Sequence, residues 1–234
     1  MRKKQSKNNQ NTQKQSLINL VKANVRSLTL AGFGILMVVI AAYQLYIHNR
    51  AIKSNTGKIN LSDIVESSDI EPSEVKPQES DIIHVAPEMP KKITIDSVGI
   101  NGYVQQVGTG VDGTIAVPTN IHIAGWFTKS VKPGAKGLSI VDGHVQGIYE
   151  QGIFRNLNQV KSGDEIVIEY GDGIKKKFEV DSTVDIPKAE ATGAVYRRIP
   201  GIESQLTVIT CTGKYDNASR SYENRFIVYA KLTE

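Results

Sequence analysis

Cys211 is the only cysteine among the 234 residues of the chain, and it ends the apolar run LTVITC at residues 206–211. A lone cysteine has no partner for a disulfide within the chain, and the four ligands of a structural zinc site are not available. Three interpretations remain: a buried apolar residue, an intermolecular cross-link, or a nucleophile. Because free cysteine is among the most buried residue types, the thiol alone does not decide between them.

A cysteine nucleophile needs a partner that takes its proton and later donates a proton to a leaving amine. Of the four histidines, His48 borders an apolar segment and His84 lies in a polar stretch. His122 lies in an apolar stretch and is interpreted as a satisfied core or loop histidine. His144 follows the apolar run LSIVD at a glycine-marked turn, which places an imidazole at a strand end, where functional groups are often presented. His144 is therefore the candidate acid and base.

A cation near the thiol would complete such a site. The polar stretch at residues 212–224 follows Cys211, and a second β-type run begins at Arg225. If the two runs pair as antiparallel strands, Arg225 lies opposite Cys211 on the same sheet face. A guanidinium there favours the thiolate and can donate hydrogen bonds to an oxyanion. Arg220 is the rival for this role, and a solvated loop charge is the alternative for both arginines.

Short β-type runs between Gly, Asp and Pro residues dominate residues 91–234, which we interpret as one domain. Helical signals are confined to residues 150–157 and to a turn near 188–196. About eight short strands in a domain of this size favour a closed barrel or a sandwich. The expected strands are 92–95, 102–107, 114–117, 138–142, 165–170, 174–180, 182–186, 205–211 and 225–232.

Residues 28–47 carry no charge over twenty positions, enough to span a bilayer of about 30 Å as a helix. Residues 1–27 hold seven Lys or Arg and no Asp or Glu, which predicts a cytoplasmic tail before an uncleaved transmembrane anchor. A cleaved signal peptide, the rival, has a shorter apolar region. Residues 48–90 are polar with four prolines, and we expect an extended extracytoplasmic linker there.

The charge distribution excludes a nucleic-acid surface. The chain has a net charge of +4, and the basic tail contributes +7, so the remaining residues carry −3. The basic character therefore belongs to the tail, and no aromatic residues alternate with its cations as single-strand readers require. No acidic cluster suggests a metal site, so neither metal nor cofactor is expected.

These features together resemble the sortases, membrane-anchored cysteine transpeptidases of mainly Gram-positive bacteria. The family pattern T-L-x-T-C is similar to residues 207–211, with Val208 in place of Leu, and Glu223-Asn224-Arg225 resembles the segment that carries the family's essential arginine. The stretches GTIAVPTNIHIAGW and KPGAKGLSIVDGHV are similar to the class F branch. Because the loop before the arginine varies in length within the family, Arg220 remains an alternative to Arg225.

The resemblance implies a mostly β fold, a closed eight-stranded barrel with one or two short helices after one transmembrane helix. It also implies that Cys211 attacks a threonine carbonyl in a C-terminal LPxTG-like sorting signal of secreted proteins. Arg225 would hold the oxyanion, and His144 would protonate the leaving amine. Thr210 would position substrate, or would simply be a good strand former. An amine from a cell-wall precursor or a pilin lysine would then resolve the thioester.

Two other functions stay open. A cysteine peptidase shares the first half-reaction and differs only in that water resolves the acyl-enzyme. A non-catalytic, membrane-anchored β-domain for adhesion or wall binding would use Cys211 as a structural residue, silent when replaced by alanine.

Overall fold

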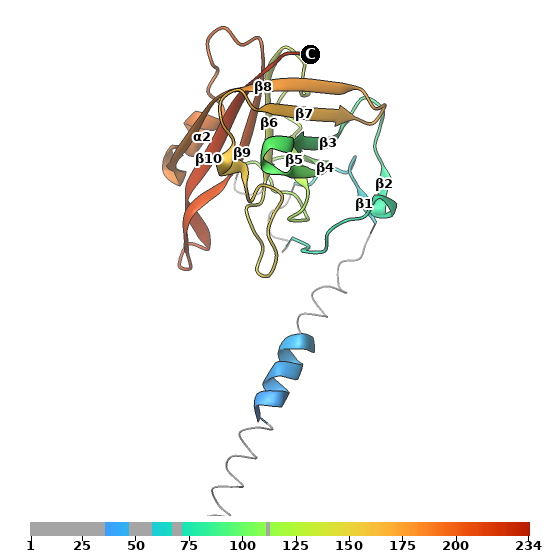
Figure 1. The fold of residues 1–234 in the computed structure, drawn as a ribbon, viewed down its shortest axis with the longest axis vertical. Coiled ribbons are helices and arrows are strands. Elements are labelled where there is room, and N and C mark those ends of the chain that lie inside the picture. Colours follow the sequence, from blue (N-terminus) through green and yellow to red (C-terminus); the bar gives the residue numbers. More distant parts are fainter. Residues whose placement is uncertain (1–35, 47–57, 67–71, 111–112) are drawn as a thin grey trace, which may run out of the picture. The chain divides into compact units, whose positions relative to one another are not determined.

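Eight strands close into a barrel in the order β10-β8-β7-β3-β4-β5-β6-β9 (Figure 1). This computed structural model describes residues 36–46, 58–66, 72–110 and 113–234. The barrel expected from the sequence is confirmed. Its strands are β3 (Pro90–Ile95), β4 (Ile100–Val107), β5 (Ala124–Phe127), β6 (Gly137–Gly143), β7 (Glu165–Tyr170), β8 (Lys175–Pro187), β9 (Ser204–Asp216) and β10 (Ser221–Leu232).

The chain divides into two units, residues 1–54 and 55–234. In the first, residues 36–46 form a helix whose side chains are all exposed. Among the described residues, no helix combines the length and the apolar character that crossing a membrane requires. The rest of the expected anchor at 28–47, and the whole basic tail at 1–27, lie outside the described residues.

Alternating side chains give β9 and β10 two buried faces. On β10, Phe226, Val228 and Ala230 join the core inside the barrel. Ile227 and Tyr229 point the other way, into a second cluster on the outer face with Val195, Val184 and Ile209, among others. Burying each such aliphatic side chain stabilises the fold by about 1.5–3 kcal/mol, so both faces fix the pairing of these two strands.

Three local expectations were wrong. Residues 114–117 do not form a barrel strand, and only Ile115 makes an isolated bridge there. The strand beside β4 is instead β5, from the apolar stretch around Trp126. The two strands expected at 174–180 and 182–186 are one long strand, β8, with a register shift opposite Tyr229 and Ala230.

Residues 150–157, expected to be helical, form turns followed by η3 (Leu157–Gln159). The backbone N–H groups of Gly152 and Phe154 donate to the carbonyl groups of Val145 and His144. These donors are therefore not available for a helical ladder. The expected turn near 188–196 is confirmed as η4 (Lys188–Glu190) and the short helix α2 (Ala191–Val195).

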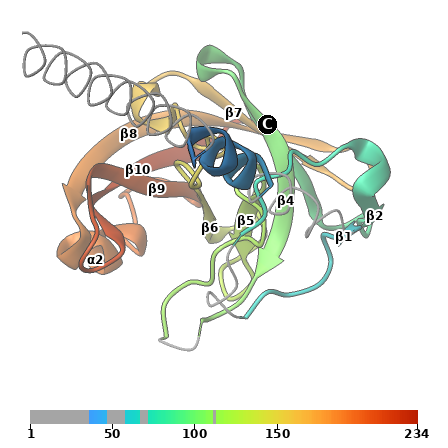
Figure 2. The ribbon, with the colours of Figure 1, turned by 90° about the horizontal axis from the view of Figure 1, so that it is seen from below.

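The described part of residues 58–90 packs on the barrel and is not the extended spacer that its polar composition indicated. Leu61 is only 2% exposed and packs against Tyr103 and Ile123. Backbone bonds join Val65 to Gln106 and to Gly108. This segment contains β1 (Ile59–Asn60), η1 (Glu79–Asp81) and β2 (Ile82–His84), and η2 (Asp96–Val98) follows β3. Figure 2 shows β1 and β2 on the side of the barrel away from α2.

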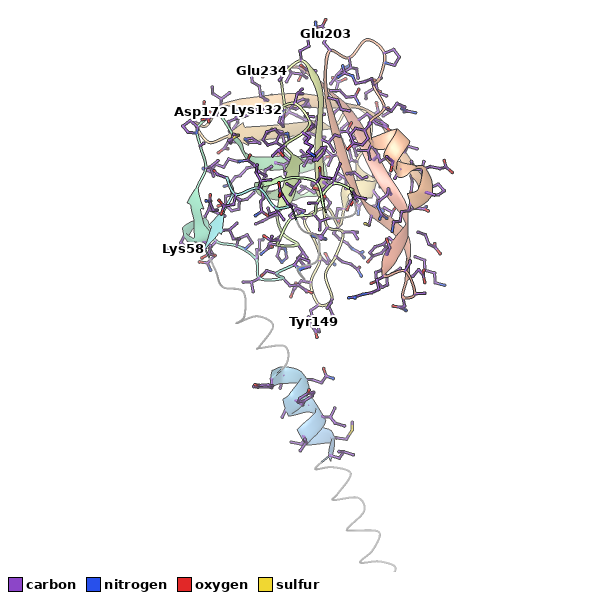
Figure 3. The ribbon with its side chains drawn as sticks, turned by 180° about the vertical axis from the view of Figure 1, so that it is seen from behind. Lys58, Lys132, Tyr149, Asp172, Glu203 and Glu234 are labelled. Atoms are coloured by element: carbon purple, nitrogen blue, oxygen red, sulfur yellow. The ribbon has the colours of Figure 1, made fainter. Side chains whose placement is uncertain are left out.

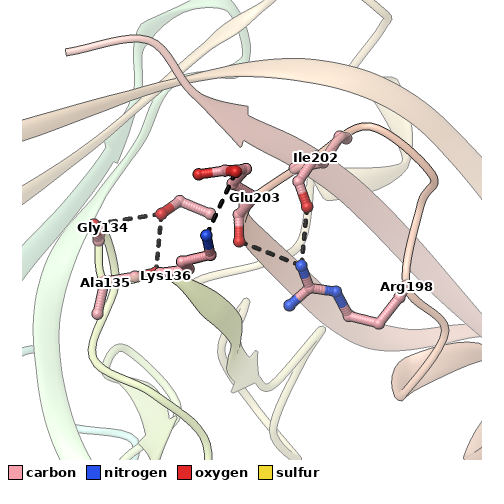
Figure 4. A network of polar contacts seen from close by, with 7 residues as sticks. Gly134, Ala135, Lys136, Arg198, Ile202 and Glu203 are labelled. Carbon is pink, nitrogen blue, oxygen red and sulfur yellow. Dashed lines mark hydrogen bonds and ion pairs between the residues drawn. The ribbon is translucent and has the colours of Figure 1, made fainter.

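Two parallel strands, β6 and β9, determine where the functional residues meet. They pair in register from Gly137 with Ser204 to Asp142 with Ile209. A polar network clamps the beginning of both strands: Lys136 pairs with Glu203 at 3.3 Å, and Ser204 Oγ donates to the Ala135 carbonyl at 2.8 Å (Figure 4). Arg198 donates to the carbonyl groups of Ile202 and Glu203, at 2.8 and 3.1 Å. Both strands therefore run toward the same end of the barrel, the end opposite Glu203, where Figure 3 labels Tyr149.

Candidate active site

Cys211 and Arg225 lie directly opposite each other, as partners in the antiparallel pairing of β9 with β10. Directly opposed residues share a sheet face, and this is the outer face that carries Ile209 and Ile227. The pairing expected from the sequence is thus confirmed. Cys211 is a free, half-buried thiol. Burial raises the pKa of the Cys211 thiol, and the Arg225 charge opposes this rise.

The Arg225 guanidinium is held by its own hairpin. Nη1 donates to the carbonyl groups of Tyr222 and Asn224, at 3.1 and 2.9 Å, and Nη2 donates to Ser221 Oγ at 3.3 Å. In the described part of the chain, no carboxylate forms an ion pair with it. No described carboxylate therefore neutralises the positive charge next to Cys211.

Arg220, the rival arginine, lies in the turn between β9 and β10 with a φ of 49°. Its side chain is exposed. The next residue, Ser221, pairs with Asp216 and not with Cys211. At about 3.3 Å per residue, the four positions from Arg225 to Ser221 span about 13 Å along β10. Arg220 lies beyond Ser221 and is therefore farther than this from Arg225. The structure therefore brings Arg225, and not Arg220, beside the thiol.

His144 leaves the barrel one residue after β6 ends. It stands two positions beyond Asp142, just as Cys211 stands two positions beyond Ile209, the partner of Asp142. The His144 Nε2 atom lies 3.1 Å from the Pro118 carbonyl oxygen. A carbonyl only accepts, so Nε2 carries the proton and Nδ1 is the free base. Burial lowers the pKa of His144, and the Pro118 bond partly offsets this.

Thr210 links the ends of the two strands. Its buried hydroxyl donates to the Gly143 carbonyl at 2.8 Å. Gly143 immediately precedes His144, and Thr210 immediately precedes Cys211. The hydroxyl thus holds the end of β6 against β9, and its expected role in positioning substrate stays a prediction.

Glu74 is a site element that the sequence reasoning missed. Its carboxylate accepts the backbone N–H groups of Ile148, Tyr149 and Glu150 at 2.6, 2.8 and 2.8 Å. Its carbonyl oxygen lies 3.0 Å from His122 Nε2, so the expectation that His122 is a satisfied histidine is confirmed. No local pattern marks Glu74, because the partners of its carboxylate are 74 to 76 residues away.

The segment around Glu74, residues 72–76, forms a strap between the two loops that flank His144. On one side, the backbone of Ser73 bonds with that of Thr119 and Ile121, close to the Pro118 carbonyl. On the other side, Glu74 caps the loop at 147–150. The strap therefore fixes the surroundings of the imidazole from outside the barrel.

Asp142 was also missed, although an acid inside an apolar strand is a visible signal. The residue is 8% exposed, and its Oδ1 atom is buried without a hydrogen-bond partner. A Cβ built on the neighbouring Gly125 would lie 2.4 Å from that oxygen, so the glycine makes room for the carboxyl group. Burial raises the pKa of Asp142 well above its usual range. Burial therefore favours the protonated carboxyl group, and a negative charge on Asp142 would raise the pKa of the Cys211 thiol.

A pocket of about 350 Å³ opens beside Cys211. It lies between the end of β9, the beginning of β10 and the turns that lead into η3. Among the described residues, no group of three His, Cys, Asp or Glu side chains is placed to hold a metal ion. The pocket is lined by Val145, Phe154, Arg155, Asn156, Asn158, Gln159, Thr210, Cys211, Thr212, Gly213 and Tyr222.

The sequence that forms the barrel matches a known family. The sequence model of the sortase domain matches residues 93–233, more than half of the chain. The chain therefore belongs to the sortase family. A search of curated protein sequences gave no match.

Solved structures of the same fold include three from different bacteria. Sortase A of Corynebacterium diphtheriae, as a lid mutant, is 22% identical, with 65% of this chain and 73% of that chain covered and a TM-score of 0.48. A Clostridium perfringens sortase D5 transpeptidase is 22% identical over 64% and 83% of the chains, at 0.47. Sortase C-1 of Actinomyces oris is 21% identical over 65% and 90%, at 0.46. The resemblance to class F stays a prediction.

Proposed function

We propose that this protein is a membrane-anchored cysteine transpeptidase that joins secreted proteins to an amine acceptor. The observation that carries the proposal is the register of three strands. Arg225 lies opposite Cys211 in this register, and His144 follows the end of the neighbouring strand β6, two positions beyond the pairing of Asp142 with Ile209. Family membership supplies the reaction class, acyl transfer between a sorting signal and an amine.

In the first half-reaction, the Cys211 thiolate attacks the carbonyl carbon of the threonine in an LPxTG-like sorting signal. Arg225 donates hydrogen bonds to the oxyanion that forms. When this intermediate collapses, the peptide C–N bond breaks, and the leaving amine takes a proton from protonated His144. A thioester between Cys211 and the secreted protein remains.

In the second half-reaction, an incoming amine attacks the thioester carbonyl. Neutral His144 accepts the proton from the attacking nitrogen, Arg225 again holds the oxyanion, and the thiolate leaves. The product is an amide, and the enzyme returns to its thiolate and imidazolium state. The acceptor amine comes from a cell-wall precursor or a pilin lysine, and no cofactor takes part.

The pKa directions predict the pH profile of this reaction. Burial raises the pKa of Cys211 and lowers that of His144, so the neutral thiol and neutral imidazole dominate between the two values. The reactive thiolate–imidazolium pair has the same number of protons, so its small share is constant in this interval. The share of this pair falls at lower pH, where His144 is protonated beside a neutral thiol. It also falls at higher pH, where both groups have lost their protons.

We therefore expect a bell-shaped plot of kcat/KM against pH for a sorting-signal peptide. Its acidic limb should lie below the usual histidine pKa, and its alkaline limb above the usual thiol pKa. A single rise with its midpoint well below the usual thiol pKa would contradict the expectation, since it would show an already ionised thiol.

The membrane location is part of the proposal. The uncharged run at 28–47 and the seven cations of residues 1–27 support an anchor whose N-terminus is cytoplasmic. The catalytic barrel would then lie outside the cell membrane. There it meets secreted proteins that pass through the same bilayer.

The test uses the full chain in detergent and a set of peptides that vary the LPxTG motif. Without an amine, mass spectrometry should detect a thioester on Cys211. With triglycine or hydroxylamine added, the product should be the corresponding amide or hydroxamate. Free acid as the only product in the presence of amine would identify a peptidase. Failure of every peptide to form an adduct would favour the non-catalytic binding domain.

A further inference from the structure

We propose that the polar pocket beside Cys211 binds the amine acceptor, and that Arg155 makes it select amines whose carrier has a free carboxylate. This proposal rests on the proposed function, because it concerns the second half-reaction.

The pocket extends from the thiol to the residue that follows His144, the group that exchanges protons with the amine in the proposed reaction. Val145, the residue after His144, lines one wall, and Cys211 with the next two residues of β9 lines another. The leaving amine takes its proton from His144, and the incoming amine returns one to it. Both nitrogens must therefore come to the same side of the thioester carbonyl.

The sheet face on which Cys211 lies is apolar. It carries Ile209 and Ile227 next to the thiol and its arginine, with Val184 and Ile186 of β8 and Ile199 of the following loop. Such a surface suits the leucine and proline of a sorting signal. The polar pocket is then left for the amine.

The lining of the pocket contains no Asp or Glu. An amine attacks only in its neutral form, and a carboxylate in the wall would instead favour the ammonium ion. The polar groups of the lining include the side-chain amides of Asn156, Asn158 and Gln159 and the Tyr222 phenol. These groups donate and accept hydrogen bonds, as a peptide requires.

Among the described residues that line the pocket, Arg155 has the one charged side chain. Its Nη1 atom donates a long hydrogen bond to Gln146 Oε1 at 3.5 Å. In the described parts of the chain, no carboxylate pairs with it within 4.0 Å. A planar guanidinium binds a carboxylate through two parallel hydrogen bonds, which a neutral amide does not match. A pocket of about 350 Å³ lies within the usual range for small ligands.

The test compares two acceptors that differ only in this charge, triglycine and triglycinamide. The full-length enzyme in detergent is given a sorting-signal peptide, and the acceptor KM for amide formation is measured with each. We expect the KM for triglycine to be about fivefold lower, the size of one partly exposed ion pair. In Arg155→Gln this difference should disappear, because the triglycine KM rises to that of triglycinamide.

Two variants and one separate readout make the result unambiguous. Arg155→Lys keeps the charge and should keep part of the preference, and Lys175→Gln removes an exposed cation of β8 and should keep all of it. Equal KM values in the unmodified enzyme, or a preference that survives in Arg155→Gln, would overturn the acceptor site while the thioester still forms. Absence of the thioester itself would overturn the proposed function, and the acceptor site with it.

Discussion

Cys211→Ala is expected to abolish covalent capture of sorting-signal peptides and all transfer to amines, while the free energy of unfolding changes by no more than about 1 kcal/mol. The thiol is half-buried and forms no disulfide, so its removal leaves no large cavity. The adduct is measured by mass spectrometry and the unfolding by thermal and denaturant melts.

Cys211→Ser is the matched control for shape, since it keeps a small polar group at the same position. It should fold equally well and form no detectable adduct, because a serine hydroxyl beside these groups is far less ionised than a thiol. Turnover that persists in the alanine variant would show that another residue is the nucleophile. A thiol that resists iodoacetamide in the folded protein would favour a structural cysteine instead.

Arg225→Ala should lower kcat/KM by about 10²- to 10³-fold, the loss typical of removing one oxyanion donor. A change in the Cys211 pKa should lower the rate as well. Since Arg225 opposes the rise in the Cys211 pKa, its removal should raise the pKa of the thiol further and move the alkaline limb of the pH profile upward. Stability should change much less, because β9 and β10 are also paired through their buried apolar faces.

Arg220→Ala is the natural comparison, because this arginine belongs to the same hairpin but lies at its turn. It should change kcat/KM by less than about twofold, as an exposed turn residue does. If Arg220→Ala were the crippling variant and Arg225→Ala were mild, the assignment based on strand register would be wrong.

Much of the barrel and two partners of the site could be predicted because they follow from short-range patterns. Alternating apolar residues on either side of the polar stretch at 212–224 imply a hairpin, and a hairpin puts Arg225 opposite Cys211. The histidine at the end of β6 could be chosen from its glycine turn. The position of His144 relative to Cys211 along the sheet could not be predicted. This position depends on the parallel pairing of β6 with β9, whose paired residues, such as Gly137 and Ser204, are far apart in the sequence.

The predictions that were wrong also concern segments whose structure depends on long-range contacts. Residues 150–157 have helical spacing, but the N–H groups of Gly152 and Phe154 bond to carbonyl groups of the segment that carries His144. The strand β5 is four buried residues long, so it shows no alternation. The sequence of the strap is typical of a spacer, because the contacts that order it are with residues far away in the chain.

The strap determines where the chain can be truncated without disturbing the surroundings of His144. A chain begun at Pro90 would keep all eight barrel strands and the proposed catalytic residues Cys211, His144 and Arg225. It would nevertheless lose Glu74. The backbone N–H groups of residues 148–150 would then no longer donate to the Glu74 carboxylate. In such a shortened chain, His144, the proposed general acid, would lie between two loops that the strap no longer holds. We therefore expect the working boundary of the catalytic unit to lie before Pro72.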